Sequence, residues 1–315
     1  MNRARMEAHG SAGARGRSRS DIRALWHRLR HTTGSILRWV VLIDFAYVFV
    51  FPVIYMVTTS IQTMSDINNP AVHWISRTPT FEGYQIAITA LGYWDGLYNS
   101  ALTSVLAAVG QTLVGAMVAY GLARLRFPGR DLIFGLLLFT IVVPAQTIIV
   151  PQFMLYVKLK WVDSFIPLIA PACMGWGVRG AVLLIVYRQF FRGLPYELED
   201  AAYVDGAGPL RTFWEIMLPL AKPAILVVML FSLVWTWNDT LVPWLVLRSD
   251  KLMTLSQRIE VFYFMLNREN PQLRIHVEPN VFMAATTLCA LPLLVIYMFA
   301  QRHFTQSIDR TGLVE

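Results

Sequence analysis

Three charged side chains lie inside long apolar stretches of this sequence. Asp44, Arg179 and Asp239 each stand among mainly apolar neighbours. A charge in the middle of a lipid bilayer costs roughly 2.5–3.5 kcal/mol on insertion scales. If these stretches cross a membrane, each of the three side chains is expected to face other protein groups or a water-filled cavity.

The stretch WTWNDTLVPW around Asp239 holds the kinds of group that bind sugars. Pro243 has no N–H, so the carbonyl of Asp239 loses its usual helical partner. Together with Asn238 it would form a polar notch for hydroxyl groups, while Trp235 and Trp237 offer flat apolar faces to sugar C–H groups. The alternative, which we favour, is a structural kink whose polar groups satisfy one another.

Arg179 lies in the stretch GWGVRGAV, where glycines leave room around the side chain. We favour an internal ion pair with Asp44 or Asp239. In the alternative, Arg179 faces a cavity and binds an anionic sugar through two parallel hydrogen bonds.

The composition favours a membrane protein. The 315 residues are 56% hydrophobic and only 15% charged, with a mean hydropathy of +0.49, whereas soluble domains carry about 25% charged residues. The two cysteines lie in apolar runs, and the six histidines show no metal-ligand spacing, so neither a disulfide framework nor a metal site is expected.

Six apolar runs are long enough to cross a bilayer, which takes about 20 helical residues. We place them near residues 36–59, 99–122, 132–156, 164–187, 223–247 and 281–301. With both termini inside, the inner segments carry 18 Lys and Arg and the outer segments eight. This bias favours an N-in, C-in orientation, although the outer loop 248–280 holds five of those eight. The expected fold is therefore all-α, with about six transmembrane helices.

The N-terminal residues 1–35 form a basic region, since nine Arg precede Trp39. Arginine-rich stretches can bind nucleic acid, but this one adjoins an apolar run and is expected to be a cytoplasmic membrane flank. Residues 21–31 are predicted to form a short interfacial helix, and residues 1–20 a disordered tail. Residues 36–315 then form the transmembrane domain.

A polar segment, residues 188–222, interrupts the apolar sequence. Pro195 and Pro209 can each start a helix, and Gly206 can form the tight turn between them. The acidic residues at the start of the first helix interact favourably with the positive N-terminal end of its dipole. The segment is predicted to be a helix–turn–helix at the inner membrane face, with Ala201 and Ala202 near its tip. It either docks a partner protein or merely covers the helix ends.

The second run carries small residues at every fourth position: Ser100, Ser104, Ala108, Thr112 and Ala116. Small side chains let helices approach closely in a membrane. This pattern predicts a packing seam.

The polar segment resembles the signature loop of permease subunits in bacterial ABC importers. The pattern is Asp200-Ala201-Ala202, then Gly206, Ile216 and Leu218-Pro219, with Asp in place of the usual Glu at 200. The stretches AYGLARLRFPGRDLIF, VVPAQTIIVPQFMLY, RQFFRGLPYELEDAA and WNDTLVPWLVL are similar to the carbohydrate branch, in particular to the smaller of the two maltose-type permeases.

The resemblance implies the type I importer fold and a role for residues 188–222 as the coupling loop that docks on an ATPase. Its candidate coupling residues are Glu199, Asp200, Ala201, Ala202, Asp205, Gly206, Ile216, Leu218 and Pro219. The implied partners are a second homologous permease, two ATP-binding subunits, an extracytoplasmic solute-binding protein and membrane lipid. The implied location is the bacterial cytoplasmic membrane.

The chain itself is expected to bind no cofactor and to be no enzyme. None of its four lysines follows a glycine, so it lacks the phosphate-binding loop that ends in Gly-Lys. ATP and Mg²⁺ would be used by the partner subunits. A secondary transporter driven by an ion gradient is the alternative, with Asp44 and Asp239 as its membrane carboxylates. No metal cluster or nucleophile motif supports a membrane enzyme.

Overall fold

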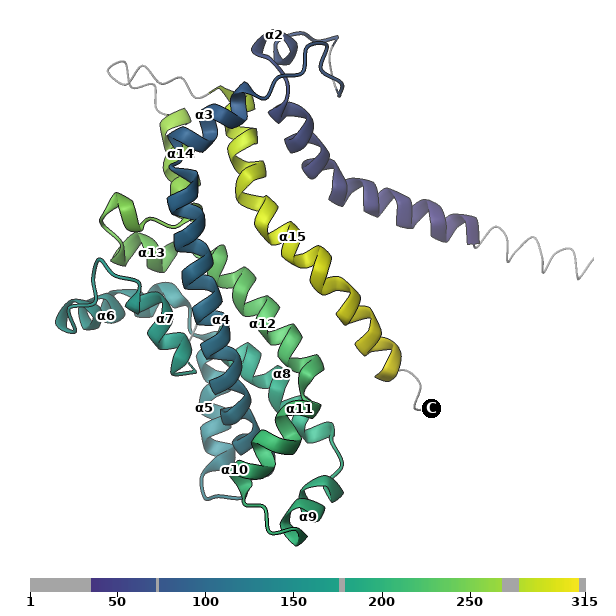
Figure 1. Ribbon diagram of the computed structural model, residues 1–315, viewed down its shortest axis with the longest axis vertical. Helices are drawn as coiled ribbons and strands as arrows, with labels where there is room; N and C mark the ends of the chain where they lie inside the picture. Colours follow the sequence, from purple (N-terminus) through teal and green to yellow (C-terminus); the bar gives the residue numbers. More distant parts are fainter. Residues whose placement is uncertain (1–34, 72–73, 176–178, 268–277, 312–315) are drawn as a thin grey trace, which may run out of the picture. The chain divides into compact units, whose positions relative to one another are not determined.

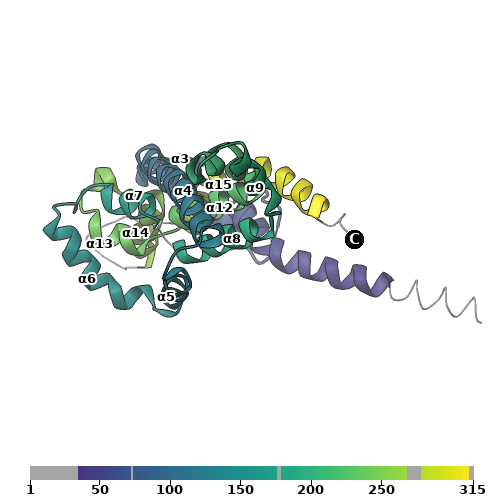
Figure 2. The same ribbon diagram turned by 90° about the horizontal axis from the view of Figure 1, so that it is seen from below.

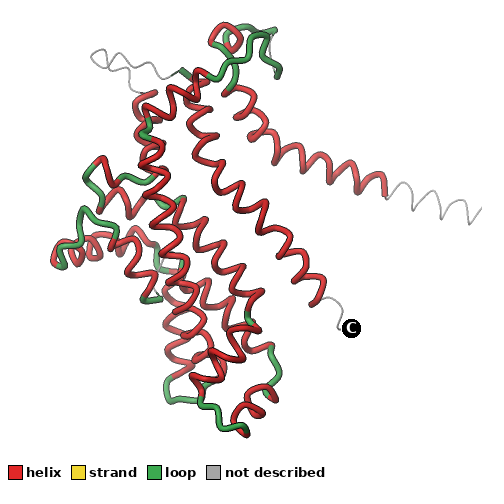
Figure 3. Tube along the Cα trace, in the orientation of Figure 1, coloured by secondary structure: helices red, strands yellow, loops and turns green. Residues whose placement is uncertain are grey.

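The computed structural model describes residues 35–71, 74–175, 179–267 and 278–311, and these residues form helices joined by loops (Figure 3). The chain divides into two units, Met1–Thr58 and Thr59–Glu315. The predicted tail and interfacial helix, residues 1–31, lie outside the described residues. The first unit is represented by the helix Ser35–Ser60, whose apolar side chains are exposed.

The second unit consists of short and long helices in the following order: α2 (Met64–Ile67), α3 (Glu82–Ala90), α4 (Tyr93–Arg124), α5 (Arg130–Val142), α6 (Ala145–Lys158), α7 (Ile166–Cys173), α8 (Gly180–Gly193), α9 (Glu197–Val204), α10 (Pro209–Thr212), the π-helix η1 (Phe213–Met217), α11 (Leu218–Leu220), α12 (Lys222–Trp237), α13 (Leu241–Val246), the 3₁₀-helix η2 (Asp250–Leu252), α14 (Leu255–Asn267) and α15 (Pro279–Thr311).

Three described helices are long and apolar enough to cross a membrane: Ser35–Ser60, α4, and residues Pro279–Arg302 of α15. They match three of the six predicted runs. Two bent pairs bring the number to five if each pair crosses once. These pairs are α5 with α6, bent by 104°, and Pro209–Leu220 with α12, bent by 80°.

The predicted runs 132–156, 164–187 and 223–247 are therefore not continuous helices. Pro144 separates α5 from α6, and Val143 before it is extended, because a residue that precedes proline avoids the helical region. Gly175 and Arg179 both have positive φ between α7 and α8. In the run 223–247, helix α12 ends at Trp237, and α13 begins only at Leu241.

The longest helix of the second unit without an internal proline, α4, packs against α7, α8 and α12. All five residues of the predicted seam are buried, which confirms the prediction. The contact is close, because a Cβ atom added at Gly110 would lie 2.3 Å from the Cys173 sulfur.

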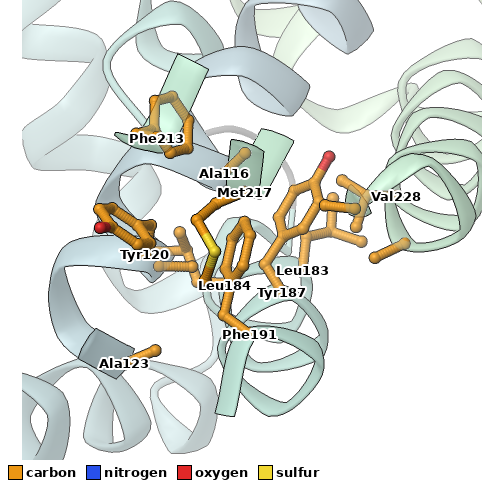
Figure 4. Packing of buried hydrophobic residues seen from close by; sticks show 13 residues of the cluster. Ala116, Tyr120, Ala123, Leu183, Leu184, Tyr187, Phe191, Phe213, Met217 and Val228 are labelled. Atoms are coloured by element: carbon orange, nitrogen blue, oxygen red, sulfur yellow. The ribbon is translucent and has the colours of Figure 1, made fainter. Parts of the chain in front are cut away.

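Two buried apolar clusters mark the two ends of this unit. The first joins α4, α8 and η1, where Tyr187 and Phe191 pack beside Phe213 and Met217 (Figure 4). The second joins α3, α14 and the start of α15, and it also contains Trp237. In Figure 1, α3 and α14 lie at one end of the long axis and α9 at the other.

A third, smaller cluster lies to one side. Tyr156, Val246 and Leu247 form it, with α6 and α13 on the same side of α4 (Figures 1 and 2). The break between α5 and α6 turns α6 away from the main bundle, and this leaves space between α6, α7, α8 and α13.

Candidate functional site

The polar segment forms the predicted helix–turn–helix. Helix α9 starts at Glu197, two residues after Pro195, and its first turn carries three carboxylates. Gly206 then adopts φ +78°, a conformation that costs a glycine nothing. Pro209 begins α10. The chain continues through η1 and α11 to the 80° bend before α12.

The second half of the segment is fastened to the bundle. Phe213 and Met217 are fully buried, and the Phe213 ring lies 5.3 Å from the ring of Tyr120 on α4. Ile216 and Leu218 pack against the same cluster, while Pro219 is exposed. The π-helix inserts one extra residue per turn, and it lies where this apolar contact is made.

The first half is held by a buried ion pair. Arg124, at the end of α4, lies with its Nη1 atom 3.6 Å from the Oε2 atom of Glu199 on α9, and both side chains are buried. The same guanidinium donates through Nε to the Phe191 carbonyl at 2.9 Å and through Nη2 to the Leu194 carbonyl. It also lies 4.2 Å from the centre of the Tyr196 ring. Arg124 thus joins α4, the end of α8 and α9.

The remaining candidate residues fall into a buried group and an exposed group. Glu199 and Ala202 are buried, so they position α9 and do not form its outer surface. Asp200, Ala201, Asp205 and Gly206 are exposed. Two apolar neighbours are exposed as well: Val204 by 87% and Leu210 by 69%. The tip of the segment therefore presents an acidic and apolar surface.

A cavity of about 760 Å³ lies between α4, α5, α6, α7, α8, α12 and α13. Of the residues proposed for a substrate path, Arg179 and Asp239 line it. Trp235 supports Arg179, whose guanidinium carbon lies 5.0 Å from the centre of its ring. The structure therefore brings Arg179, Trp235 and Asp239 together.

Two other proposed path residues, Trp237 and Asn238, are not among the residues that line the cavity. Trp237 is buried in the cluster of α3 and α14. Asn238 is exposed and donates to the Val234 carbonyl at 2.9 Å. Asp44 is exposed in the helix Ser35–Ser60 of the first unit.

The bend around Asp239 largely satisfies its own polar groups, as the kink interpretation predicts. The Asp239 carbonyl, freed by Pro243, accepts a hydrogen bond from the Ser256 hydroxyl at 3.3 Å. The Asp239 carboxylate accepts from the Leu241 N–H at 3.1 Å. The favoured ion pair of Arg179 with Asp239 is not present, since among the described residues of the unit Thr59–Glu315 no carboxylate lies within ion-pair distance of Arg179. The pair with Asp44, which belongs to the other unit, stays a prediction.

Arg124 was not predicted as a site residue from the sequence, where it counted only as an inner positive charge. The available signal was an arginine at the end of a long small-residue helix, but its partner lies 75 positions further along the chain. Within the described part of the chain, no group of three or more His, Cys, Asp or Glu side chains is placed to hold a metal ion.

A helical bundle with a protruding helix–turn–helix and a lateral cavity is the arrangement of a membrane permease subunit. Residues 111–310 match the family described as "Binding-protein-dependent transport system inner membrane component". The match covers more than half of the chain, so the chain belongs to this family. It is an inner-membrane component of a transport system, and the family gives no support to the alternative of an ion-gradient-driven transporter.

Relatives cover nearly the whole chain. The arabinooligosaccharides transport system permease protein AraQ of Halalkalibacterium halodurans is 28% identical over 291 residues, which is 90% of this chain and 99% of the relative. The sn-glycerol-3-phosphate transport system permease protein UgpE of Brucella abortus is 26% identical over 285 residues, 88% of this chain and 97% of the relative.

A solved structure has the same fold. The crystal structure of a bacterial ABC transporter involved in the import of the acidic polysaccharide alginate superposes with a TM-score of 0.74 and 23% identity. The match covers 86% of this chain and 96% of that one. This likeness confirms the predicted helical permease fold.

Proposed function

We propose that this chain is a permease subunit of an ATP-driven importer for a saccharide or a saccharide derivative. The relatives named above support this solute class. The complex would contain a second homologous permease and two ATP-binding subunits, which use ATP and Mg²⁺. An extracytoplasmic solute-binding protein would deliver the solute. In this assembly both termini face the cytoplasm.

The protruding tip of residues 197–210 carries the proposal. Val204 and Leu210 are exposed apolar side chains on the polar segment 188–222. Exposed apolar side chains among carboxylates suit a docking site for another protein. The exposed carboxylates of Asp200 and Asp205 would pair with cations of the ATP-binding subunit, while Ala201 and Gly206 leave room for close approach.

The burial of Glu199 and Ala202, together with the packing of Ile216 and Leu218, would transmit the motion of the tip, and the exposed Pro219 remains a predicted coupling residue. ATP binding would close the two nucleotide subunits and pull α9. The cavity would then turn from inward-facing to outward-facing, by the rocking kind of alternating access.

The cavity between α4, α8 and α12 is the proposed substrate path. Arg179 and Asp239 would line it and Trp235 would support Arg179. Trp237 and Asn238 would shape the bend, and Asp44 remains a predicted path residue. The loops at the other end of the unit, within residues 60–98 and 248–280, would receive the solute-binding protein.

Substitutions at the tip test the coupling proposal. Gly206→Val forces a branched side chain into a left-handed backbone, which costs about 1–2 kcal/mol or more, although a Cβ atom there meets no neighbour within 4 Å. Val204→Glu adds charge to the apolar surface. We expect the variant that combines both to insert normally but to lose the ATP-binding subunits on purification.

Gly206→Asn is the matched control, because asparagine tolerates the left-handed conformation, and it should retain the ATP-binding subunits. Ala202 is unsuitable for this test, since its side chain is buried within the loop. Normal retention of the subunits and full transport by the combined variant would refute docking through this tip.

A further inference from the structure

We propose that the solute of this permease carries a negative charge, and that Arg179 binds that charge inside the cavity. The inference rests on the proposed function and adds the chemical class of the solute: a saccharide with a carboxylate or phosphate group. Its starting observation is a guanidinium that lines a large cavity without a carboxylate partner among the described residues of its own unit, Thr59–Glu315.

The position of Arg179 suits a binding group better than a structural one. Its side chain is exposed to the cavity and lies over the Trp235 ring, 5.0 Å from the ring centre. Trp235 in turn packs against Phe231, with the two rings tilted by 35° and their centres 5.3 Å apart. An arginine stacked on an aromatic face keeps all five N–H donors available at its edges.

The backbone adds to this interpretation. Arg179 adopts φ +53° at the start of α8, and side chains other than glycine rarely take this conformation. Strained backbone of this kind is concentrated at ligand-binding sites.

The single carboxylate that lines the cavity does not neutralise Arg179. The Asp239 carboxylate accepts a hydrogen bond at 3.1 Å from the N–H of Leu241, the first residue of α13. No ion pair forms between the Asp239 carboxylate and the Arg179 guanidinium. The other polar side chains of the lining are uncharged, and they include Thr140, Gln152 and Thr236. The lining therefore combines the Arg179 guanidinium with neutral groups that can bind hydroxyls.

The size of the cavity agrees with this solute class. A volume of about 760 Å³ falls within the usual range of small-molecule sites, roughly 300–1,000 Å³. Apolar walls from Ile141, Ile148 and Val242 would contact the C–H faces of sugar rings. A carboxylate at one end of such a solute would form two parallel hydrogen bonds with the guanidinium.

A matched pair of probes tests the charge. Digalacturonate and its dimethyl ester have nearly the same size, but only the acid is charged. Binding of each to the assembled permease–ATPase complex is measured by calorimetry, without the solute-binding protein. We expect the acid to bind about tenfold or more tightly than the ester, as a charge-assisted hydrogen-bond pair implies.

Two variants locate the effect. Arg179→Met should abolish the preference for the acid over the ester, whereas Arg179→Lys should keep part of the preference. Equal binding of the two probes by the native complex, or binding of neither at millimolar concentration, would overturn the proposal. A preference that survives in Arg179→Met would do the same.

The composition of the purified complex separates this inference from the proposed function. If the native chain fails to purify with ATP-binding subunits, the proposed function itself fails. If Arg179→Met loses the second permease, Arg179 pairs with that subunit and the solute inference is wrong. Normal assembly together with a lost preference for the acid supports both.

Discussion

Two buried arginines fasten loops at the two ends of the second unit, and their partners differ. Arg124 lies 7% exposed beside the buried carboxylate of Glu199. Arg258, on α14, is 9% exposed and donates to the carbonyls of Leu91 at 2.9 Å and Asp250 at 2.6 Å. Its nearest carboxylate oxygen, on the largely exposed Asp250 side chain, is 4.0 Å away.

The difference lies in what remains when one partner is removed. At the Arg124 end, loss of either side chain leaves a buried charge without its counter-charge, which is among the costliest defects in a protein. At the Arg258 end, loss of the arginine leaves only carbonyl groups unpaired, which costs less. The end that is proposed to meet the ATPase is therefore held by the interaction more sensitive to change.

The largest expected effect comes from breaking the Arg124–Glu199 pair. Arg124→Met or Glu199→Gln should each lower the free energy of unfolding by about 3–5 kcal/mol, measured by denaturation in detergent. Both should also reduce retention of the ATP-binding subunits, because α9 loses its anchor.

The double variant Arg124→Met with Glu199→Met is the control. Replacement of both charges by apolar groups is often neutral or stabilising, so this variant should be more stable than either single one. If the double variant loses as much free energy of unfolding as the two single variants together, packing and not the ion pair holds α9.

A smaller effect is expected at the other end. Arg258→Met should lower the free energy of unfolding by about 1–3 kcal/mol through unpaired carbonyls. Hydrogen exchange should rise in residues 250–253, while ATPase subunits stay bound. Loss of those subunits in this variant would show that the two ends of the unit are coupled.

The smallest effect is expected at Asp163, an exposed residue on the α6–α13 side that holds the loop after α13. Asp163 accepts from the backbone N–H groups of Arg248 at 2.9 Å and Ser249 at 2.8 Å, and from the Ser249 hydroxyl. The hydroxyl of Ser249, and then these backbone groups, lower the pKa of the Asp163 carboxyl below its usual value. The stabilisation is therefore present above about pH 4 and is lost as the pH falls through the lowered pKa.

Asp163→Asn should remove this stabilisation at neutral pH without straining the backbone. Asp163 has φ +60°, and asparagine tolerates that conformation. Hydrogen exchange at Arg248 and Ser249 should then be faster in the variant at neutral pH, and the difference should vanish in strong acid. Equal rates at neutral pH would mean that the charge of Asp163 contributes nothing.

The sequence was sufficient for features that depend on neighbours along the chain. The turn at Gly206, the helix start at Pro209 and the small-residue seam of α4 follow from local propensity and periodicity. The interruption of the run 132–156 was missed, because hydropathy does not register Pro144, although proline chemistry would have indicated it.

The long-range contacts could not be read from the sequence. Arg124 meets Glu199 only because α4 and α8 pack together, and nothing in the spacing of these residues indicates the pair. Trp237 was expected near the substrate path as an aromatic face, but the end of α12 directs it into the cluster with α3 and α14. Side-chain direction at a helix end depends on packing partners that a sequence does not specify.

The unbroken course of α4 has a mechanical consequence. Its 32 residues make a rod about 48 Å long at 1.5 Å per residue. Arg124 ties its final turn to α9, and near its beginning Asn99 donates to the carbonyls of Lys251 and Met253. A tilt of only about 5° imposed at one end would displace the other by about 4 Å over that length. A displacement of α9 on the cytoplasmic side would thus move the loop that follows α13 on the opposite side of the membrane, because the single helix α4 connects the two.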